Sequence, residues 1–254
     1  MSKQTIAVWF SCGAASAVAA KLTLDRYGAT HNVRIVNNPV ADEDDDNQRF
    51  AADVAMWLGV PIERASNSKF PTNSCVDVWE REKFMSGPHG APCTKFLKKG
   101  ARYEWERANK PDWHVLGFTA EEQHRHDMFV LSERENLLPV LIEAGMTKDD
   151  CGALIVRSGL VLPRIYGMGY PNANCPGCVK ATSATYWNLV RRTHPEVFAQ
   201  RAEMSRRLGA RLVRHKGQRI FLDELPEDAV GRPLKEMKIE CGIFCEEVGQ
   251  RIAA

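Results

Sequence analysis

Two pairs of cysteines are spaced as residues that share one metal centre. The first is a CxxC pair, Cys175 and Cys178, and the second is a CxxxC pair, Cys241 and Cys245, close to the end of the sequence. Both spacings turn two sulfur atoms toward one point, which is typical of zinc sites and of iron–sulfur clusters. A pair near the end of a chain can also reach a site and leave it, so the second pair is a candidate mobile thiol.

A short loop of small polar residues, Ser11–Ser16, follows the apolar stretch Thr5–Phe10 and precedes the Ala-rich stretch Ala17–Tyr27. A loop between a strand and a helix presents free backbone N–H groups to an anion, and the serine hydroxyls add donors. Gly13 permits close approach of the ligand. The sequence has no GxxxxGK[ST], which excludes a Walker-type loop. A tight turn that uses small residues only for packing is the alternative.

The composition is that of an ordinary soluble globular protein, with 254 residues, 44% hydrophobic and 26% charged. A net charge of +2 does not predict strong non-specific attraction to nucleic acid. No apolar run approaches the ~20 residues that span a bilayer, so we expect no membrane association. The first apolar run enters the loop directly, as a strand rather than a signal peptide. Eight cysteines in such a chain indicate a reducing cytoplasm, where Cys75 and Cys151 would be lone, buried, inert thiols.

Apolar and helical stretches alternate in the first half of the chain, which predicts an α/β fold with a doubly wound, mostly parallel sheet. The expected strands are Thr5–Phe10, Val33–Val36, Val60–Ala65 and Trp113–Phe118, and the expected helices are Ala17–Tyr27, one that begins near Phe50, Val76–Phe84 and Thr94–Ala108. We assign residues 1–135 to this nucleotide-binding core and residues 136–254 to a helical, cysteine-bearing C-terminal region.

The C-terminal region begins a different pattern. Lys148–Gly159 is expected to be a helix, and Ala184–Leu208 a long amphipathic helix that Pro195 breaks or kinks. Pro163–Asn174 is rich in Gly, Pro and Tyr and is expected to be a loop. Leu212–Leu222 has the pattern of a hairpin around a Lys-Gly turn.

Three charged stretches have both a bland and a functional interpretation. The acidic run Asp42–Asp46 is expected to be a solvated helix N-terminus, with cation binding as the lesser alternative. Lys95 and Lys98 bring positive charge to successive turns of one helix, where they would contact phosphate or sulfate or form a solvated face. The arginines of the long helix would either form a surface for RNA or DNA or be solvated and paired; they are Arg191, Arg192, Arg201, Arg206 and Arg207.

Five stretches together resemble the adenylyl-sulfate and phosphoadenylyl-sulfate reductases of the adenine nucleotide alpha-hydrolase (PP-loop) superfamily. The Ser11–Ser16 loop resembles their modified P-loop, and the later stretches follow in the family's order. They are the Cys and basic motif at 92–98, the Trp113–Phe118 stretch followed by Glu121, Glu122 and Arg125, the stretch from Tyr166 through Cys178, and Ile239–Gly242, which is similar to the family's ECGLH motif.

The resemblance implies an adenine nucleotide site, a [4Fe–4S] cluster and a cysteine nucleophile. The residues implied for the nucleotide are Ser11, Gly13, Ala14, Ser16, Lys95, Lys98, Gly117 and Arg125. Those implied for the cluster are Cys93, Cys175 and Cys178, with a fourth position that Cys245 would complete. Cys241 falls on the nucleophile. An open iron site with three cysteines, or a structural zinc ion in place of the cluster, are the alternatives.

The resemblance implies a phosphoadenylyl-sulfate reductase-like enzyme, in which Cys241 attacks sulfur and thioredoxin or glutathione is the reductant. The chain departs from the family's Leu-His at Ile243 and Phe244 and adds Cys245, which puts simple sulfate reduction in doubt. The alternative is a sulfurtransferase that uses ATP with Mg²⁺ to thiolate a tRNA or DNA base. A non-catalytic, zinc-stabilised nucleotide-binding module is a third, and a homo-oligomer is left open.

Overall fold

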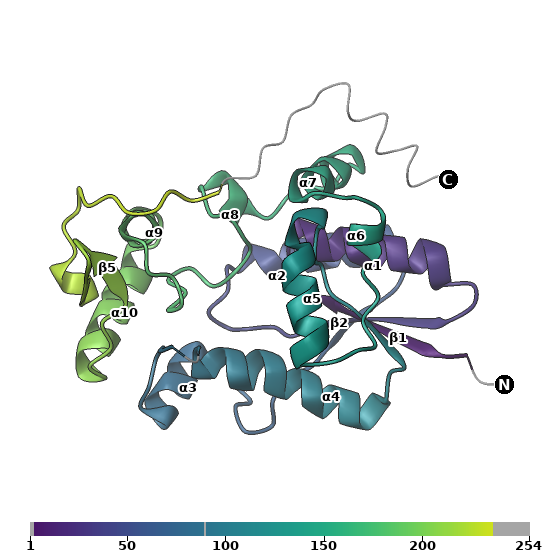
Figure 1. Ribbon diagram of the computed structural model, residues 1–254, viewed down its shortest axis with the longest axis horizontal. Helices are drawn as coiled ribbons and strands as arrows, with labels where there is room; N and C mark the ends of the chain where they lie inside the picture. Colours follow the sequence, from purple (N-terminus) through teal and green to yellow (C-terminus); the bar gives the residue numbers. More distant parts are fainter. Residues whose placement is uncertain (1–2, 89, 236–254) are drawn as a thin grey trace.

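Four parallel strands form the centre of the molecule in the computed structural model, which describes residues 3–88 and 90–235. The strands are β1 (Thr5–Phe10), β2 (Asn32–Asn37), β3 (Ile62–Arg64) and β4 (Trp113–Val115), in the order β3-β2-β1-β4. The chain leaves β1 toward β2 on one side and returns to β4 on the other. The predicted α/β fold with a doubly wound, parallel sheet is therefore confirmed (Figure 1).

Helices cover both faces of the sheet because successive side chains of β1 point to opposite sides. Ile6, Val8 and Phe10 belong to the core shared with α1 (Ala14–Tyr27), whereas Trp9 faces Trp105 of α4 (Ala101–Asn109). Figure 1 shows α1 on one side of the strands and α4 on the other. Residues near the end of β1 therefore pack against helices on both faces of the sheet, directly before the Ser11–Ser16 loop.

A second hydrophobic core lies in the C-terminal region. Trp187 and Val190 of α9 (Ala184–Thr193) and Phe198 of α10 (Pro195–Arg207) are buried there with Trp79 of α3 (Cys75–Glu82). The two long helices are separate, as the break predicted at Pro195 requires. The predicted hairpin is present as β5 (Val213–His215) and β6 (Gln218–Ile220).

The remaining elements belong to one of these two cores or connect them. They are α2 (Asp46–Leu58), the π-helix η1 (Thr94–Gly100), the 3₁₀ turns η2 (Ala120–Glu122) and η3 (Leu222–Glu224), α5 (Gln123–Ser132), α6 (Val140–Glu143), α7 (Lys148–Arg157) and α8 (Arg164–Gly167). Residues of α6 and α7 pack with α1, so the first core extends past the boundary predicted at residue 135. Among the helices described, none combines the length and apolar character needed to cross a membrane.

Candidate functional site

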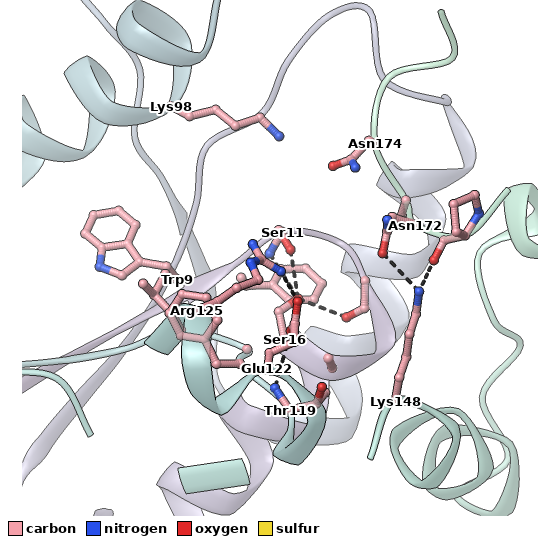
Figure 2. A pocket seen from close by; sticks show the side chains of 18 of the residues that line it. Trp9, Ser11, Ser16, Lys98, Thr119, Glu122, Arg125, Lys148, Asn172 and Asn174 are labelled. Atoms are coloured by element: carbon pink, nitrogen blue, oxygen red, sulfur yellow. Dashed lines mark hydrogen bonds and ion pairs between the residues drawn. The ribbon is translucent and has the colours of Figure 1, made fainter. Parts of the chain in front are cut away.

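A pocket of about 980 Å³ opens at the carboxyl ends of β1 and β4, around the Ser11–Ser16 loop. This is the point where the chain order of the sheet reverses, the usual location of ligand sites in open α/β sheets. Its walls come from both halves of the chain. They include Trp9, Ser11, Gly13, Ser16, Lys98, Gly117, Arg125, Lys148, Tyr166, Asn172 and Asn174 (Figure 2).

The first turn of α1 is arranged to receive an anion. Ser16 Oγ accepts a hydrogen bond from the Ser11 amide at 3.1 Å and donates to the Gly13 carbonyl at 2.9 Å, which holds the loop closed. Gly13, the residue before the helix, has no side chain to cap it. The N–H groups of Ala15 and Ser16, which line the pocket, therefore have no side-chain acceptor in the described part of the protein, and the positive end of the helix dipole lies behind them.

Two glycines let other segments approach this loop closely. A Cβ on Gly117 would lie 2.9 Å from the Ser16 nitrogen, so the chain after β4 touches the backbone of α1. A Cβ on Gly13 would lie 3.2 Å from the Tyr166 hydroxyl, which accepts a 3.4 Å hydrogen bond from the Ala14 amide. Burial raises the pKa of Tyr166 to about 12, so the hydroxyl stays protonated. Tyr166 thereby attaches the C-terminal region to the phosphate loop.

Cations stand on several sides of the loop. Lys98 Nζ lies 3.0 Å from Glu43 Oε1, and Arg125 forms an ion pair with Glu122. Lys148 donates to Asn172 Oδ1 at 2.9 Å, and burial lowers its pKa below the usual range. In Figure 2, Lys98 and Lys148 lie on different sides of Ser11 and Ser16.

Six of the eight residues predicted to bind nucleotide line this pocket. They are Ser11, Gly13, Ser16, Lys98, Gly117 and Arg125. The side chain of Ala14 is buried and does not line the pocket, and its amide donates to the Tyr166 hydroxyl. Lys95 is not part of the lining among the described residues; its ammonium lies over the Phe96 ring, 5.0 Å from the centroid. The sequence pattern did not single out Lys148 or the two asparagines.

Four thiols gather beside this pocket. Cys75 forms thiol hydrogen bonds with Cys93 and Cys175, and Cys178 lies close enough to both of these to feel their charge. All four belong to the C-terminal core or pack against it. The expectation that Cys75 is a lone thiol is therefore wrong, because helix α3 places it against Cys93 and Cys175. By contrast, Cys151 is buried in the other core, as expected.

The surroundings of these thiols favour negative charge on one of them. The hydrogen bond from Cys75, followed by the effects of the Trp79 indole and Lys180, lowers the pKa of Cys93 to about 7 against the opposing effect of burial. Cys75 donates hydrogen bonds to Cys175 and Cys93 and is buried, and both effects raise its pKa. Burial alone would lower the pKa of Lys98, yet Glu43 and the thiols Cys175 and Cys178 raise it above its ordinary value.

The thiols and the pocket share continuous stretches of chain. Thr94 and Asn174 line the pocket, and each directly adjoins a thiol, Cys93 or Cys175. Lys98, one turn further along η1, lines the pocket and also acts on the thiols. A π-helix such as η1 is uncommon and occurs often at functional sites. Charge at the thiols would therefore act on Lys98, a side chain of the pocket wall.

The donor types are those of iron–sulfur clusters and of structural zinc sites. Four cysteine sulfurs from three separate segments are the usual ligands of both. The buried Trp79 indole nitrogen lies near enough to the Cys93 sulfur to donate toward it and lower the pKa of Cys93. In residues 3–88 and 90–235, no group of three or more His, Cys, Asp or Glu side chains stands in a preformed arrangement for a metal ion. Cys241 and Cys245 lie outside the described residues.

The acidic run is not the solvated segment that was expected. Asp42 pairs with Arg201 at 2.6 Å with both side chains buried, and its other oxygen accepts from the Cys75 amide. The Asp44 carboxylate is 2% exposed and lies 2.9 Å from Arg164. Among residues 42–46, Asp45 alone is largely exposed. Cations from the C-terminal region, absent from the local sequence, explain the burial.

Comparisons with known proteins identify no family, because no protein-family model and no curated protein match the chain. Among solved structures, 23 chains match. One is a structure of the U34-tRNA thiolase NcsA from Methanococcus maripaludis with its [4Fe-4S] cluster. It is 12% identical, the match covers 98% of this chain and 81% of that chain, and the TM-score is 0.46. A likeness at this level carries no inference about substrate or cofactor.

Proposed function

We propose that the protein is an adenine-nucleotide-dependent sulfur-transfer enzyme with an iron–sulfur cluster on Cys75, Cys93, Cys175 and Cys178. The observation that carries the proposal is the continuity between the phosphate loop and the four thiols. Lys98 contributes to both, and the chain passes directly from pocket lining to thiol at two places. Such an arrangement suits a reaction in which a nucleotide-linked group and sulfur meet.

Each part of the pocket has a role in this proposal. The free amides of the first turn of α1 would bind the phosphate, and Lys98 and Arg125 would balance its charge. Lys148, partly desolvated and hydrogen-bonded to Asn172, would orient the opposite end of the ligand. The four thiols would hold the cluster, which supplies an iron centre whose charge acts on the groups around it.

The form that we favour is reduction of an adenylyl sulfate. With Cys75 as the fourth ligand, Cys245 is not needed by the cluster, and both tail thiols are left for chemistry. The Cys241 thiolate would attack sulfur, forming an S–S bond while the bond from sulfur to the phosphate oxygen breaks and AMP or its 3′-phosphate leaves. Attack by the Cys245 thiolate on Cys241 Sγ then releases sulfite and forms a disulfide. Thioredoxin or glutathione would supply the two electrons that reopen it.

A second candidate is ATP-dependent thiolation of a nucleic-acid base. Glu43, Glu121 and Glu122 lie in the same pocket as the cations. Carboxylates are suited to the Mg²⁺ that accompanies ATP and are unfavourable beside a free sulfate group. In this form the pocket would release pyrophosphate rather than sulfite.

The ligand set is tested by iron analysis of anaerobically purified protein. We expect about four irons per chain in the wild type and loss of iron and visible absorption in Cys75→Ser. Cys245→Ser should keep both, and Cys151→Ser is the matched control for loss of a buried thiol. Iron retained in Cys75→Ser, or zinc in place of iron, would contradict the ligand assignment.

The reaction is tested by product analysis with the same preparations. Sulfite and AMP from adenylyl sulfate, lost in Cys241→Ser while nucleotide binding persists, would support the reductase. Pyrophosphate released from ATP only when RNA or DNA is present would support the thiolation candidate instead. If an iron-loaded protein forms neither sulfite from adenylyl sulfate nor pyrophosphate from ATP, the proposed function is refuted.

A further inference from the structure

The hairpin of β5 and β6 carries cations that have no carboxylate partner among residues 3–88 and 90–235. Arg214 and Arg219 stand directly opposite each other in the ladder, and Lys216 occupies the turn between them. Like charges opposite each other destabilise a two-stranded ladder. No ion pair joins any of these three side chains to another group in the described part of the chain, and the stretch from Leu208 to Phe221 contains no Asp or Glu.

Three other arginines of the C-terminal region are neutralised by carboxylates. Arg201 is buried against Asp42, Arg206 pairs with Asp223 and Glu224, and Arg207 pairs with Glu80. These three were among the arginines predicted to form a basic surface. Their charge is already balanced within the protein, whereas the charge of the hairpin is not.

The hairpin is held against the protein on one face, and its cationic residues are exposed, as a docking element requires. Lys216 and Gly217 both have positive φ, 47° and 81°, which is the two-residue turn that matches the twist of paired strands. Val213 is fully buried beneath it, and the Arg214 amide donates to the Thr182 carbonyl at 2.8 Å. The buried face fixes the hairpin to the segment that follows Cys178, and the opposite face presents the cations to solvent.

We propose that this hairpin binds the phosphate backbone of a single-stranded nucleic acid. Three unpaired cations on one narrow turn can reach successive phosphates of one strand, and release of counterions from that strand favours binding. An anionic membrane fits less well, because the described part of the hairpin has no exposed large apolar side chain to insert. A bound strand would lie on the same lobe as the four thiols. The inference does not depend on the proposed function, since it concerns a surface away from the pocket lining.

The test measures binding of a fluorescein-labelled oligouridylate of about 20 nucleotides by fluorescence anisotropy, at salt concentrations between about 50 and 200 mM. Arg214→Thr with Lys216→Asn removes two cations, keeps a β-former in the strand and creates an Asn-Gly turn suited to positive φ. We expect roughly tenfold weaker binding at low salt and a salt slope smaller by about 1.4, from about 0.7 per lost contact.

The matched control is Arg107→Gln with Lys110→Asn at the end of α4, away from the hairpin (Figure 1). It removes the same charge, and Lys110 also has positive φ. We expect this control variant to bind the strand with wild-type affinity. The wild type should also bind the deoxy version of the strand with equal affinity, because phosphate contacts do not read the sugar. Absence of binding by the wild type, equal loss in both double variants, or binding to anionic vesicles but not to the strand would overturn the proposal. The assay needs neither nucleotide, cluster nor turnover, so its outcome is separate from that of the proposed function.

Discussion

Gly117 provides the sharpest test of how the phosphate loop is built. In Gly117→Ala the new methyl group would lie 2.9 Å from the Ser16 nitrogen, 3.0 Å from Ser16 Cα and 3.1 Å from the Ala15 carbonyl carbon. All three are backbone atoms at the start of α1, so no side chain can turn away to relieve the contact. The loop or the chain after β4 must move by a few tenths of an ångström.

The cost of such overpacking is about 1–3 kcal/mol. For a chain of this size, that corresponds to a thermal midpoint lower by roughly 2–12 °C. The displaced amides should also bind an adenine nucleotide more weakly, since their alignment holds the phosphate. Urea unfolding and calorimetric titration with AMP measure the two effects independently.

Gly167→Ala is the matched control for the same chemical change. Gly167 is the last residue of α8, and a Cβ there would meet nothing within 4 Å. Its free energy of unfolding should be unchanged or higher by a few tenths of a kcal/mol, because alanine restricts the unfolded chain. A Gly117→Ala protein as stable as Gly167→Ala, with unchanged nucleotide binding, would refute the close-contact argument.

Three further predictions concern charge and burial. Arg201→Met should lower the free energy of unfolding by about 3 kcal/mol, because it leaves a buried carboxylate unpaired, whereas Arg206→Met at an exposed pair should change little; urea titration compares them. Burial and neighbouring arginines lower the pKa of His114 to about 3, so this side chain is neutral in the folded protein. Between pH 6.5 and 4.5 only the unfolded chain binds the proton, so the free energy of unfolding should fall by up to about 1.4 kcal/mol for each pH unit of acidification. This dependence on pH should be weaker in His114→Gln. Cys12, 4% exposed and with a pKa that burial raises to about 12, should resist iodoacetamide at pH 8 until the protein unfolds; rapid labelling of the folded protein, located by mass spectrometry, would contradict this.

The central sheet was predictable because its signals are local. Thr5–Phe10 is apolar along its whole length, as a strand buried on both faces must be, and it ends at a run of small residues. Pro195 lacks the amide that a continuous helix needs, so the break between α9 and α10 follows from that residue alone. The hairpin followed in the same way from the Lys-Gly pair at its turn.

The parts that were not predicted depend on contacts distant in sequence. Cys75 lacks a nearby cysteine, and its relation to Cys93 and Cys175 arises only when α3 packs into the C-terminal core. Helix α5 has His126 as its single buried residue, so it shows little apolar periodicity. Burial of Asp42 and Asp44 requires Arg201 and Arg164, which lie more than a hundred residues away.

The ion pairs of the acidic run also couple the unfolding of the two cores. Three carboxylates of the run, Asp42, Glu43 and Asp44, bind cations from α10, η1 and α8, which belong to the second core or to the segments that join it to the first. Separation of the C-terminal lobe would therefore leave Asp42, Glu43 and Asp44 desolvated without their partners, or would force them to open to water. The two cores are expected to unfold in one cooperative transition, and a ligand in the pocket between their walls would stabilise both together.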